Sequence, residues 1–206
     1  MQIVVAASDA QWTELTGNRT GAEWVRVPDD AAFAAYPGAD CFFNFLEKRT
    51  ISGYANLNKP VLIDSVVQTL QELHAPPNVL RMNGWPGFMK RSVWELAGNA
   101  DDLLRTIFDT LGIRIQAVSD EPGFIAARVI AMIINEAYLA LEEKVSTKNE
   151  INTAMKLGTN YPFGPFEWAD TIGASKILTL LERLNKESNR YKPAAALVTE
   201  VKQQIA

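Results

Sequence analysis

Few residues in this chain have side chains that do acid–base or nucleophilic chemistry on their own. The only histidine is His74 and the only cysteine is Cys41. A histidine can exchange protons near neutral pH, and a thiolate can act as a nucleophile. His74, however, closes an expected helix before Pro76, where an imidazole can meet the last carbonyls. Cys41 lies in the apolar run CFFNF, which is typical of a small buried side chain. We expect neither residue to be catalytic.

A second kind of chemistry, dinucleotide binding, would need glycines directly after the first strand. Such glycines make the tight turn and let the pyrophosphate approach the backbone. Here the apolar run QIVVAAS is followed by Asp9, Ala10 and Gln11, and the first glycine is Gly17. A carboxylate at Asp9 would also occupy the positive end of the following helix, where a pyrophosphate should lie. The fingerprint is therefore absent, and we expect no bound cofactor.

One acidic residue has the position of a ribose-binding group. Asp29 follows the second predicted strand, EWVRV, after Pro28. An acid at this place can accept hydrogen bonds from the ribose hydroxyls of NAD. We favour a second interpretation, in which Asp29 is the N-cap of the short helix that begins beside Asp30. Asp29 is thus a cofactor-binding candidate with a structural alternative.

Residues 1–119 alternate between predicted strands and short predicted helices. β-branched runs such as QIVVAAS and KPVLIDSV predict buried strands, and VVQTLQELHA (66–75) predicts a helix. NADDLLRTIFDTLG predicts an amphipathic helix. Alternation of this kind predicts an α/β domain with a short, mostly parallel, Rossmann-like sheet.

Residues 120–206 contain no strand signal and predict an all-α domain. A long helix over residues 122–144 is apolar on most of its faces, as expected for a helix buried in a core or against a second subunit. Thr147 and Glu150 form the pattern of a capping box for the next helix. The boundary between the two domains is predicted between residues 119 and 120.

Composition excludes several classes of function. The formal net charge is −4 and no basic block is present, so we expect no nucleic-acid partner. No uninterrupted apolar run is long enough to span a bilayer, so we expect no membrane association. A single cysteine cannot form an internal disulfide, which fits a reducing cytoplasm.

The second half resembles the C-terminal domain of 3-hydroxyacyl-CoA dehydrogenases. The resemblance is carried by DEPGFIAAR, NEAYLALEEKVSTKNEINTAMKLG and YPFGPFEWADTIG, and it covers residues 120–173 with little interruption. It implies a helical fold of the 6-phosphogluconate dehydrogenase C-terminal type and a symmetric homodimer built on that domain. It also implies NAD-dependent oxidation of 3-hydroxyacyl-CoA in fatty-acid metabolism. The first half resembles the nucleotide domain of the family in its order of elements, but it is much shorter.

The resemblance also implies where the catalytic residues should lie. A family histidine takes the hydroxyl proton and a glutamate orients it; along MNGWPGFMKRSVWELAG these positions fall on Asn83 and Glu95. The family serine falls on Ser65, with Asp64 as the alternative register. The family asparagine of the PGFI segment falls on Ala127. An amide cannot accept a proton near neutral pH, and a methyl group cannot hydrogen-bond, so Ser65, Asn83 and Glu95 are expected to be a remnant site.

Three functions follow from this pattern. The first is a catalytically inactive relative that dimerises, and the missing glycine turn favours it. The second is a residual dehydrogenase that still uses NAD. The third is a protein that binds a small molecule, such as an acyl-CoA-like thioester, and exposed aromatic rings at Trp85, Phe88 and Trp94 would favour it.

Overall fold

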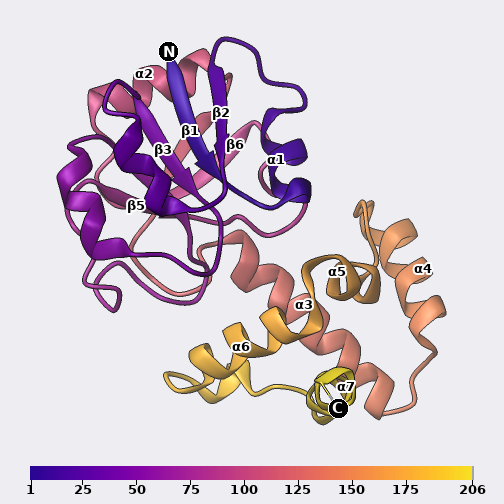
Figure 1. Ribbon diagram of the computed structural model, residues 1–206. Helices are drawn as coiled ribbons and strands as arrows, with labels where there is room; N and C mark the ends of the chain where they lie inside the picture. Colours follow the sequence, from indigo (N-terminus) through magenta and orange to yellow (C-terminus); the bar gives the residue numbers. More distant parts are fainter. Residues whose placement is uncertain (206) are drawn as a thin grey trace. The chain divides into compact units, whose positions relative to one another are not determined.

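The computed structural model describes residues 1–205 and divides the chain into two compact units, Met1–Phe124 and a second unit from Ile125 onward (Figure 1). The division lies a few residues after the predicted boundary. Residues 120–124 belong to the first unit, where they are hydrogen-bonded to Arg81 of β5 (Val79–Met82) and to the segment that follows β4 (Val61–Asp64). The backbone N–H of Gly123, for example, donates to the carbonyl of Val66 over 2.7 Å.

The first unit is built on one seven-stranded sheet with the order β2-β1-β3-β4-β5-β6-β7. The strands are β1 Gln2–Ala6, β2 Glu23–Val27, β3 Cys41–Asn44, β4 Val61–Asp64, β5 Val79–Met82, β6 Val93–Ala97 and β7 Arg114–Ala117. Strands β1 to β5 pair in parallel, β6 is antiparallel to β5, and β7 is parallel to β6. This confirms the predicted mostly parallel, Rossmann-like sheet. Strand β6 lies in a segment where no strand was predicted.

Side chains alternate between the two faces of the sheet, and each face has its own apolar core. On β1, Ile3 and Val5 pack into the cluster that includes residues of α1 (Asp9–Thr16) and α2 (Asp102–Thr110). Val4 and Ala6 pack into the opposite cluster, which includes residues of the 3-10 turns η1 (Asp30–Ala35) and η2 (Ile51–Leu57). Burial of both faces explains why the strands read as continuous apolar runs.

The prediction of a helix over residues 66–75 is wrong, because only one helical turn forms there. Thr69 and Glu72 cap this turn reciprocally: the N–H of Thr69 donates to the Glu72 carboxylate over 2.9 Å, and the N–H of Glu72 donates to the Thr69 hydroxyl over 3.1 Å. A helix that starts at Thr69 cannot extend beyond about one turn, because the backbone of His74 has a positive φ of 49° shortly before Pro76. His74 is exposed and lies before the amino end of β5, whereas Asn83 follows its carboxyl end.

A fully buried arginine binds residues 120–124 to the sheet. Arg81 of β5 has no exposed surface. Its guanidinium pairs with the Asp120 carboxylate, donates to the carbonyl of Ser65 over 3.0 Å and to that of Glu121, and stacks on the Phe124 ring at 4.4 Å. Asp120 also accepts the N–H of Leu70 over 3.1 Å. These contacts, which we call the Arg81 latch, fix the path of the chain out of the sheet.

The latch predicts a stability that falls in acid. Burial alone would raise the pKa of Asp120, but hydrogen bonds from Arg81 and from the N–H of Leu70 outweigh it, and the pKa is lowered from 3.8. A carboxyl whose pKa is depressed by folding stabilises the protein above its unfolded pKa, and this contribution is lost as the pH falls through the folded pKa. Asp120→Asn should therefore reduce stability more at pH 7 than at a pH well below 3.8, the pKa of an unperturbed aspartate. Urea unfolding at both pH values measures this, with the exposed Asp109→Asn as the control; an equal loss at both values would contradict it.

The second unit is helical, as predicted, and its longest helix is largely covered by the others (Figure 1). The helices are α3 Ala126–Glu142, α4 Lys148–Thr159, α5 Pro165–Ile172, α6 Ala174–Asn185 and α7 Ala195–Ile205, with a 3-10 turn η3 at Asn189–Tyr191. α3 packs against α5, α6 and α7. The predicted capping box of α4 is confirmed, with Thr147 and Glu150 bound reciprocally. Within the described residues no helix is long and apolar enough to cross a membrane.

Candidate functional site

The place where this sheet could bind a dinucleotide is the crevice between β1 and β3. The strand order reverses there, because β2 lies on one side of β1 and β3 on the other. In open α/β sheets ligands bind at such a switch point, outside the carboxyl ends of the strands. Ser8 follows β1 and Phe45 follows β3 at this point, and the N–H of Phe45 donates to the carbonyl of Ala6 over 2.9 Å.

The side chain of Gln11 bridges the two walls of this crevice. Its Oε1 accepts the backbone N–H and the hydroxyl of Ser8, each over 3.0 Å. Its Nε2 donates to the carbonyl of Phe45 over 3.0 Å. Ser8 is the N-cap of α1 and Gln11 is the residue that completes its capping box. A glutamine amide thus makes the hydrogen bonds that link the helix start to β3.

The first turn of α1 carries an ion pair rather than an anion site. Arg26 of β2 reaches over the turn, pairs with Asp9 at 2.7 Å, donates to the carbonyl of Ala7 over 2.9 Å and lies 5.8 Å from the centre of the Trp12 ring. With no glycine between β1 and α1, the backbone cannot approach a pyrophosphate closely. The residues present do not fit NAD bound in the way usual for such sheets.

The acids after β2 also have protein partners. Asp29, the cofactor-binding candidate, is exposed and is the N-cap of η1, where its Oδ1 accepts the N–H of Ala31 over 3.0 Å. Asp30 accepts the hydroxyl of Tyr54 over 2.7 Å and the N–H of Thr50 over 2.6 Å. Burial, reinforced by the bond to Asp30, raises the pKa of Tyr54. Both acids therefore stabilise turns of the chain itself.

The structure brings the three residues of the predicted remnant site into one row. The parallel register of β4 and β5 pairs Asp64 with Met82, and the antiparallel register of β5 and β6 pairs Met82 with Leu96. Continued by one residue, these registers place Ser65, Asn83 and Glu95 side by side across three neighbouring strands. The sequence positions taken from the resemblance are thus spatial neighbours.

The side chains in this row are largely engaged in local hydrogen bonds. The Ser65 hydroxyl donates to the carbonyl of Gln68 over 2.8 Å. The Oδ1 of Asn83 accepts the N–H of Trp85 over 3.2 Å, while its buried Nδ2 has no hydrogen-bond partner among the described residues. Ser65 and Asn83 are each only 6% exposed. Asn83 is therefore a buried amide that shapes the turn after β5.

Asp64, the alternative to Ser65, has a structural role. Its Oδ1 accepts the N–H of Gly84 over 3.0 Å, and a Cβ on Gly84 would lie 2.6 Å from the Asp64 carboxyl carbon. Only glycine allows this close approach. The pair holds the loop after β5 against the end of β4.

Ala127 and the three aromatic rings complete the set of predicted positions. Ala127 is fully buried in α3, and its methyl group offers no hydrogen bond. Trp85, Phe88 and Trp94 are 3%, 6% and 3% exposed, so they belong to the interior of the first unit. They do not offer the exposed aromatic surface expected of a ligand cleft. Among the described residues no group of histidine, cysteine and acidic side chains could hold a metal ion.

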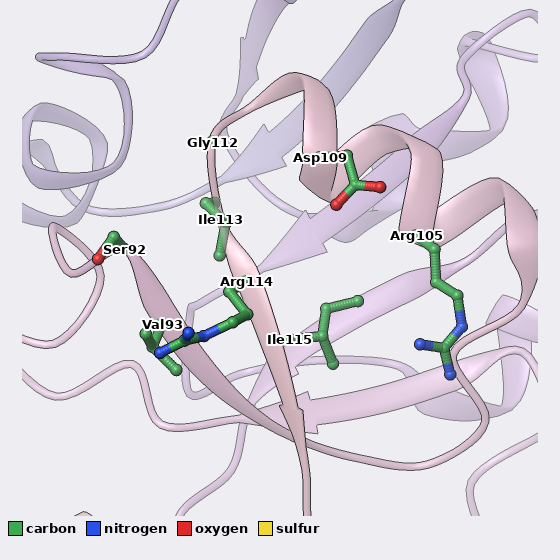
Figure 2. Close-up of a pocket in the computed structure, with 8 residues that line it drawn as sticks. All are labelled: Ser92, Val93, Arg105, Asp109, Gly112, Ile113, Arg114 and Ile115. Atoms are coloured by element: carbon green, nitrogen blue, oxygen red, sulfur yellow. The ribbon is translucent and has the colours of Figure 1, made fainter.

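An open pocket of about 680 Å³ lies beside the edge strand β7, between it and α2 (Figure 2). Its apolar part comes from Ile113 and Ile115, and its charged rim from Arg105 and Arg114. In Figure 2 the two guanidinium groups point away from each other. They do not converge on a common point, so this pocket lacks the arrangement that would hold a single anion.

Comparisons with known proteins agree with the resemblance. Residues 123–204 match the family model described as "3-hydroxyacyl-CoA dehydrogenase, C-terminal domain". The chain is 43% identical over 185 residues to 3-hydroxyadipyl-CoA dehydrogenase of Escherichia coli K12, covering 85% of this chain and 38% of that relative. It is 38% identical over 93 residues to 3-hydroxybutyryl-CoA dehydrogenase of Bradyrhizobium diazoefficiens, covering 44% of this chain and 32% of that one. The chain thus spans well under half the length of these relatives.

Among solved structures, (S)-3-hydroxybutyryl-CoA dehydrogenase from Ralstonia eutropha shares the fold. The TM-score is 0.74 with 20% identity, and the superposition covers 98% of this chain and 93% of that one. The 3-hydroxybutyryl-CoA dehydrogenase from E. coli K12 has a TM-score of 0.58 and 32% identity, over 69% of this chain and 31% of that one. The sequence signature of the helical unit, the mostly parallel sheet and these relatives agree: the chain belongs to the 3-hydroxyacyl-CoA dehydrogenase family.

Proposed function

We propose that this chain is a catalytically inactive member of its family, which keeps the helical unit as a packing and dimerisation module. The observation that carries the proposal is the Gln11 bridge across the β1–β3 crevice. The Gln11 side chain accepts hydrogen bonds from Ser8 and donates one to Phe45, and these bonds take the place of a glycine turn. The Asp9–Arg26 ion pair lies beside this bridge, at the first turn of α1.

The absence of a base supports the same conclusion. Asn83 occupies the place that the resemblance gives to the catalytic histidine, and an amide does not accept a proton near neutral pH. General-base catalysis is typically worth about 10²–10⁴-fold in rate. Ala127 removes the amide that should place the substrate oxygen. Loss of base, oxygen-positioning amide and cofactor turn together favours an inactive protein over a residual NAD-dependent dehydrogenase.

A protein of this kind should not bind NADH usefully. A ligand that binds only the folded state stabilises it by roughly 2.7 kcal/mol at one hundred times its Kd. Because the crevice is bridged by Gln11, a thermal-shift titration with millimolar NADH should show no change in Tm beyond that of sodium phosphate at equal ionic strength. An active family member serves as the positive control. A saturable rise in Tm for this chain would overturn the proposal.

The proposed partner is a second copy of the chain, bound through the helical unit. The apolar character of residues 122–144 supports this partner. Because α5, α6 and α7 pack against α3, only the part of α3 that they leave exposed can contact a second copy.

A further inference from the structure

The edge strand β7 leaves one side of the sheet unpaired. β7 is the last strand in the sheet order, with β6 on one side and no strand of the described chain on the other. The N–H groups of Arg114 and Val118 donate to carbonyls on the β6 side over 2.8 and 3.0 Å. Because successive N–H groups of a strand point to opposite sides, those of Ile115 and Ala117 point to the open edge. This edge has the donors and acceptors that one more strand would need.

Part of this edge already binds a side chain in place of a strand. The Gln116 amide donates to the carbonyl of Ala117 over 3.1 Å. The edge is otherwise open to solvent, since Arg114, Gln116 and Ala117 are exposed and Ile115 is only partly buried against the core. An added strand would replace one exposed side-chain bond and would cover Ile115. Addition of a strand to a free edge is a common mode of peptide recognition.

The two arginines of the pocket beside β7 lie on opposite faces of the sheet. Ile115 packs against the core cluster that contains residues of α2, so α2 and its exposed Arg105 lie on that face. Arg114 points to the other face, where its stem lies beside Val93 (Figure 2). Side chains of an added strand alternate between the same two faces. Two adjacent acidic residues in that strand would therefore meet Arg105 and Arg114, one on each face.

Both arginines can take an acidic partner. Neither forms an ion pair with a carboxylate of the described residues, and the Nε of Arg105 donates to the carbonyl of Ala100 over 3.1 Å. Asp109 lies one helical turn after Arg105, about 6 Å further along the axis of α2. Two residues of a strand rise roughly 6.5 Å. The side chain two places from the acid at Arg105 would therefore lie at Asp109, where a basic residue is complementary.

A second copy of β7 is a poor occupant of this edge. If two β7 strands paired antiparallel about a two-fold axis at Ile115, both copies of Arg105 would approach that axis, because Arg105 and Ile115 line the same pocket. Like charges brought together at an interface weaken binding. The charges beside β7 therefore favour a different polypeptide that carries acidic side chains.

We propose that β7 binds an extended segment of another protein as an added antiparallel strand, with two acids and a base at three successive positions. The first acid pairs with Arg105, the second with Arg114 and the base with Asp109. Antiparallel pairing is slightly more stable per residue than parallel pairing. A segment that runs in this direction passes Arg105 before Asp109, because Asp109 lies beside the start of β7 (Figure 2).

A pair of labelled peptides tests the surface and the direction together. The probe is fluorescein-labelled Thr-Val-Glu-Glu-Lys-Val-Thr. Its matched control is Thr-Val-Lys-Glu-Glu-Val-Thr, which has the same composition and charge in the reverse order. Fluorescence anisotropy over a series of protein concentrations up to millimolar should show saturable binding of the probe. The control should bind about tenfold more weakly, because its charges meet like charges at Arg105 and Asp109.

Variants of the chain locate the contact. Arg105→Glu and Arg114→Glu each set an acid against an acid of the probe and should raise its dissociation constant by about tenfold or more. Asp109→Lys should weaken the probe and favour a peptide in which glutamate replaces its lysine. Ala117→Pro removes an N–H from the open edge and leaves the bonds to β6 in place, so it should weaken the probe without a change in charge. Lys48→Glu, at an exposed position of the same unit, is the control and should leave binding unchanged.

Each outcome supports or overturns a stated part of the proposal. Absence of saturable binding by both peptides at millimolar protein overturns it. Equal binding of the two peptides, or binding that a folded Ala117→Pro variant leaves unchanged, overturns strand addition. Tighter binding of the control peptide overturns the antiparallel direction. Self-association of the wild-type chain that Ala117→Pro abolishes would make a second copy the occupant instead. Circular dichroism melts report whether Ala117→Pro is folded, and if it is not, the two peptides and the arginine variants still decide the question.

Discussion

Replacing Arg81 with methionine is expected to lower the free energy of unfolding of the first unit by about 3–5 kcal/mol. Methionine keeps much of the buried stem but removes every donor. The carbonyls of Ser65 and Glu121 lose their bonds to the guanidinium, and Asp120 loses its ion-pair partner. Removing one partner of a buried ion pair typically costs about 3–5 kcal/mol, and the buried carbonyl of Ser65 also loses its charged donor.

Tryptophan fluorescence during urea unfolding measures this change, because four of the five tryptophans, Trp12, Trp24, Trp85 and Trp94, belong to the first unit. Arg105→Met on the exposed surface of α2 is the matched control and should cost less than about 0.5 kcal/mol. Arg81→Lys should lie between the two, since an ammonium cannot reach all three acceptors in the geometry of a planar guanidinium. A loss below about 1 kcal/mol for Arg81→Met would show that the Arg81 latch contributes little to stability.

The second large effect concerns activity. The chain is expected to reduce acetoacetyl-CoA at least about 10⁴-fold more slowly than an active family member, and Asn83→His with Ala127→Asn should not recover the difference. A general base supplies about 10²–10⁴-fold, whereas holding the hydride donor and substrate together can supply some 7–11 kcal/mol of the barrier. The double variant restores the base beside Glu95. Gln11, however, still bridges the crevice where the hydride donor NADH should lie.

Oxidation of NADH followed at 340 nm compares wild type, the double variant and the active relative. Ala127 is fully buried, so asparagine there adds volume to a packed site and should cost about 1–3 kcal/mol. Asn83→His alone is therefore measured as well, and circular dichroism reports whether each variant is folded. Clear turnover by a folded variant would mean that the nucleotide site works by another route and that only the base was lost. Turnover by the wild type would contradict the proposed function itself.

The identity of most elements could be predicted from the sequence, because local patterns determine them. Burial on both faces produces the apolar runs of β1 and β4, and the Thr147–Glu150 box, three residues apart, starts α4. The prediction of a helix over 66–75 is wrong for a reason that is partly tertiary. The N–H groups of Leu70 and Gln71 are bound by the carboxylate of Asp120, some fifty residues away, which with the Thr69–Glu72 cap fixes the start of the turn at Thr69. The positive φ of His74 then ends it after one turn.

For the site, the sequence shows that no glycine turn follows β1, and comparison with the family pattern shows no histidine at position 83 and no amide at position 127. Folding cannot supply a residue type that the chain lacks. The contacts that occupy these places instead became known from the three-dimensional structure. The Gln11–Phe45 bond, the Asp9–Arg26 pair and the Arg81–Asp120 pair join residues 34, 17 and 39 positions apart. Their formation depends on strand order and register, which side-chain periodicity along the chain does not encode. The antiparallel entry of β6 that sets Asn83 beside Glu95 is of the same kind, because pairing direction is determined by contacts between strands and not within them.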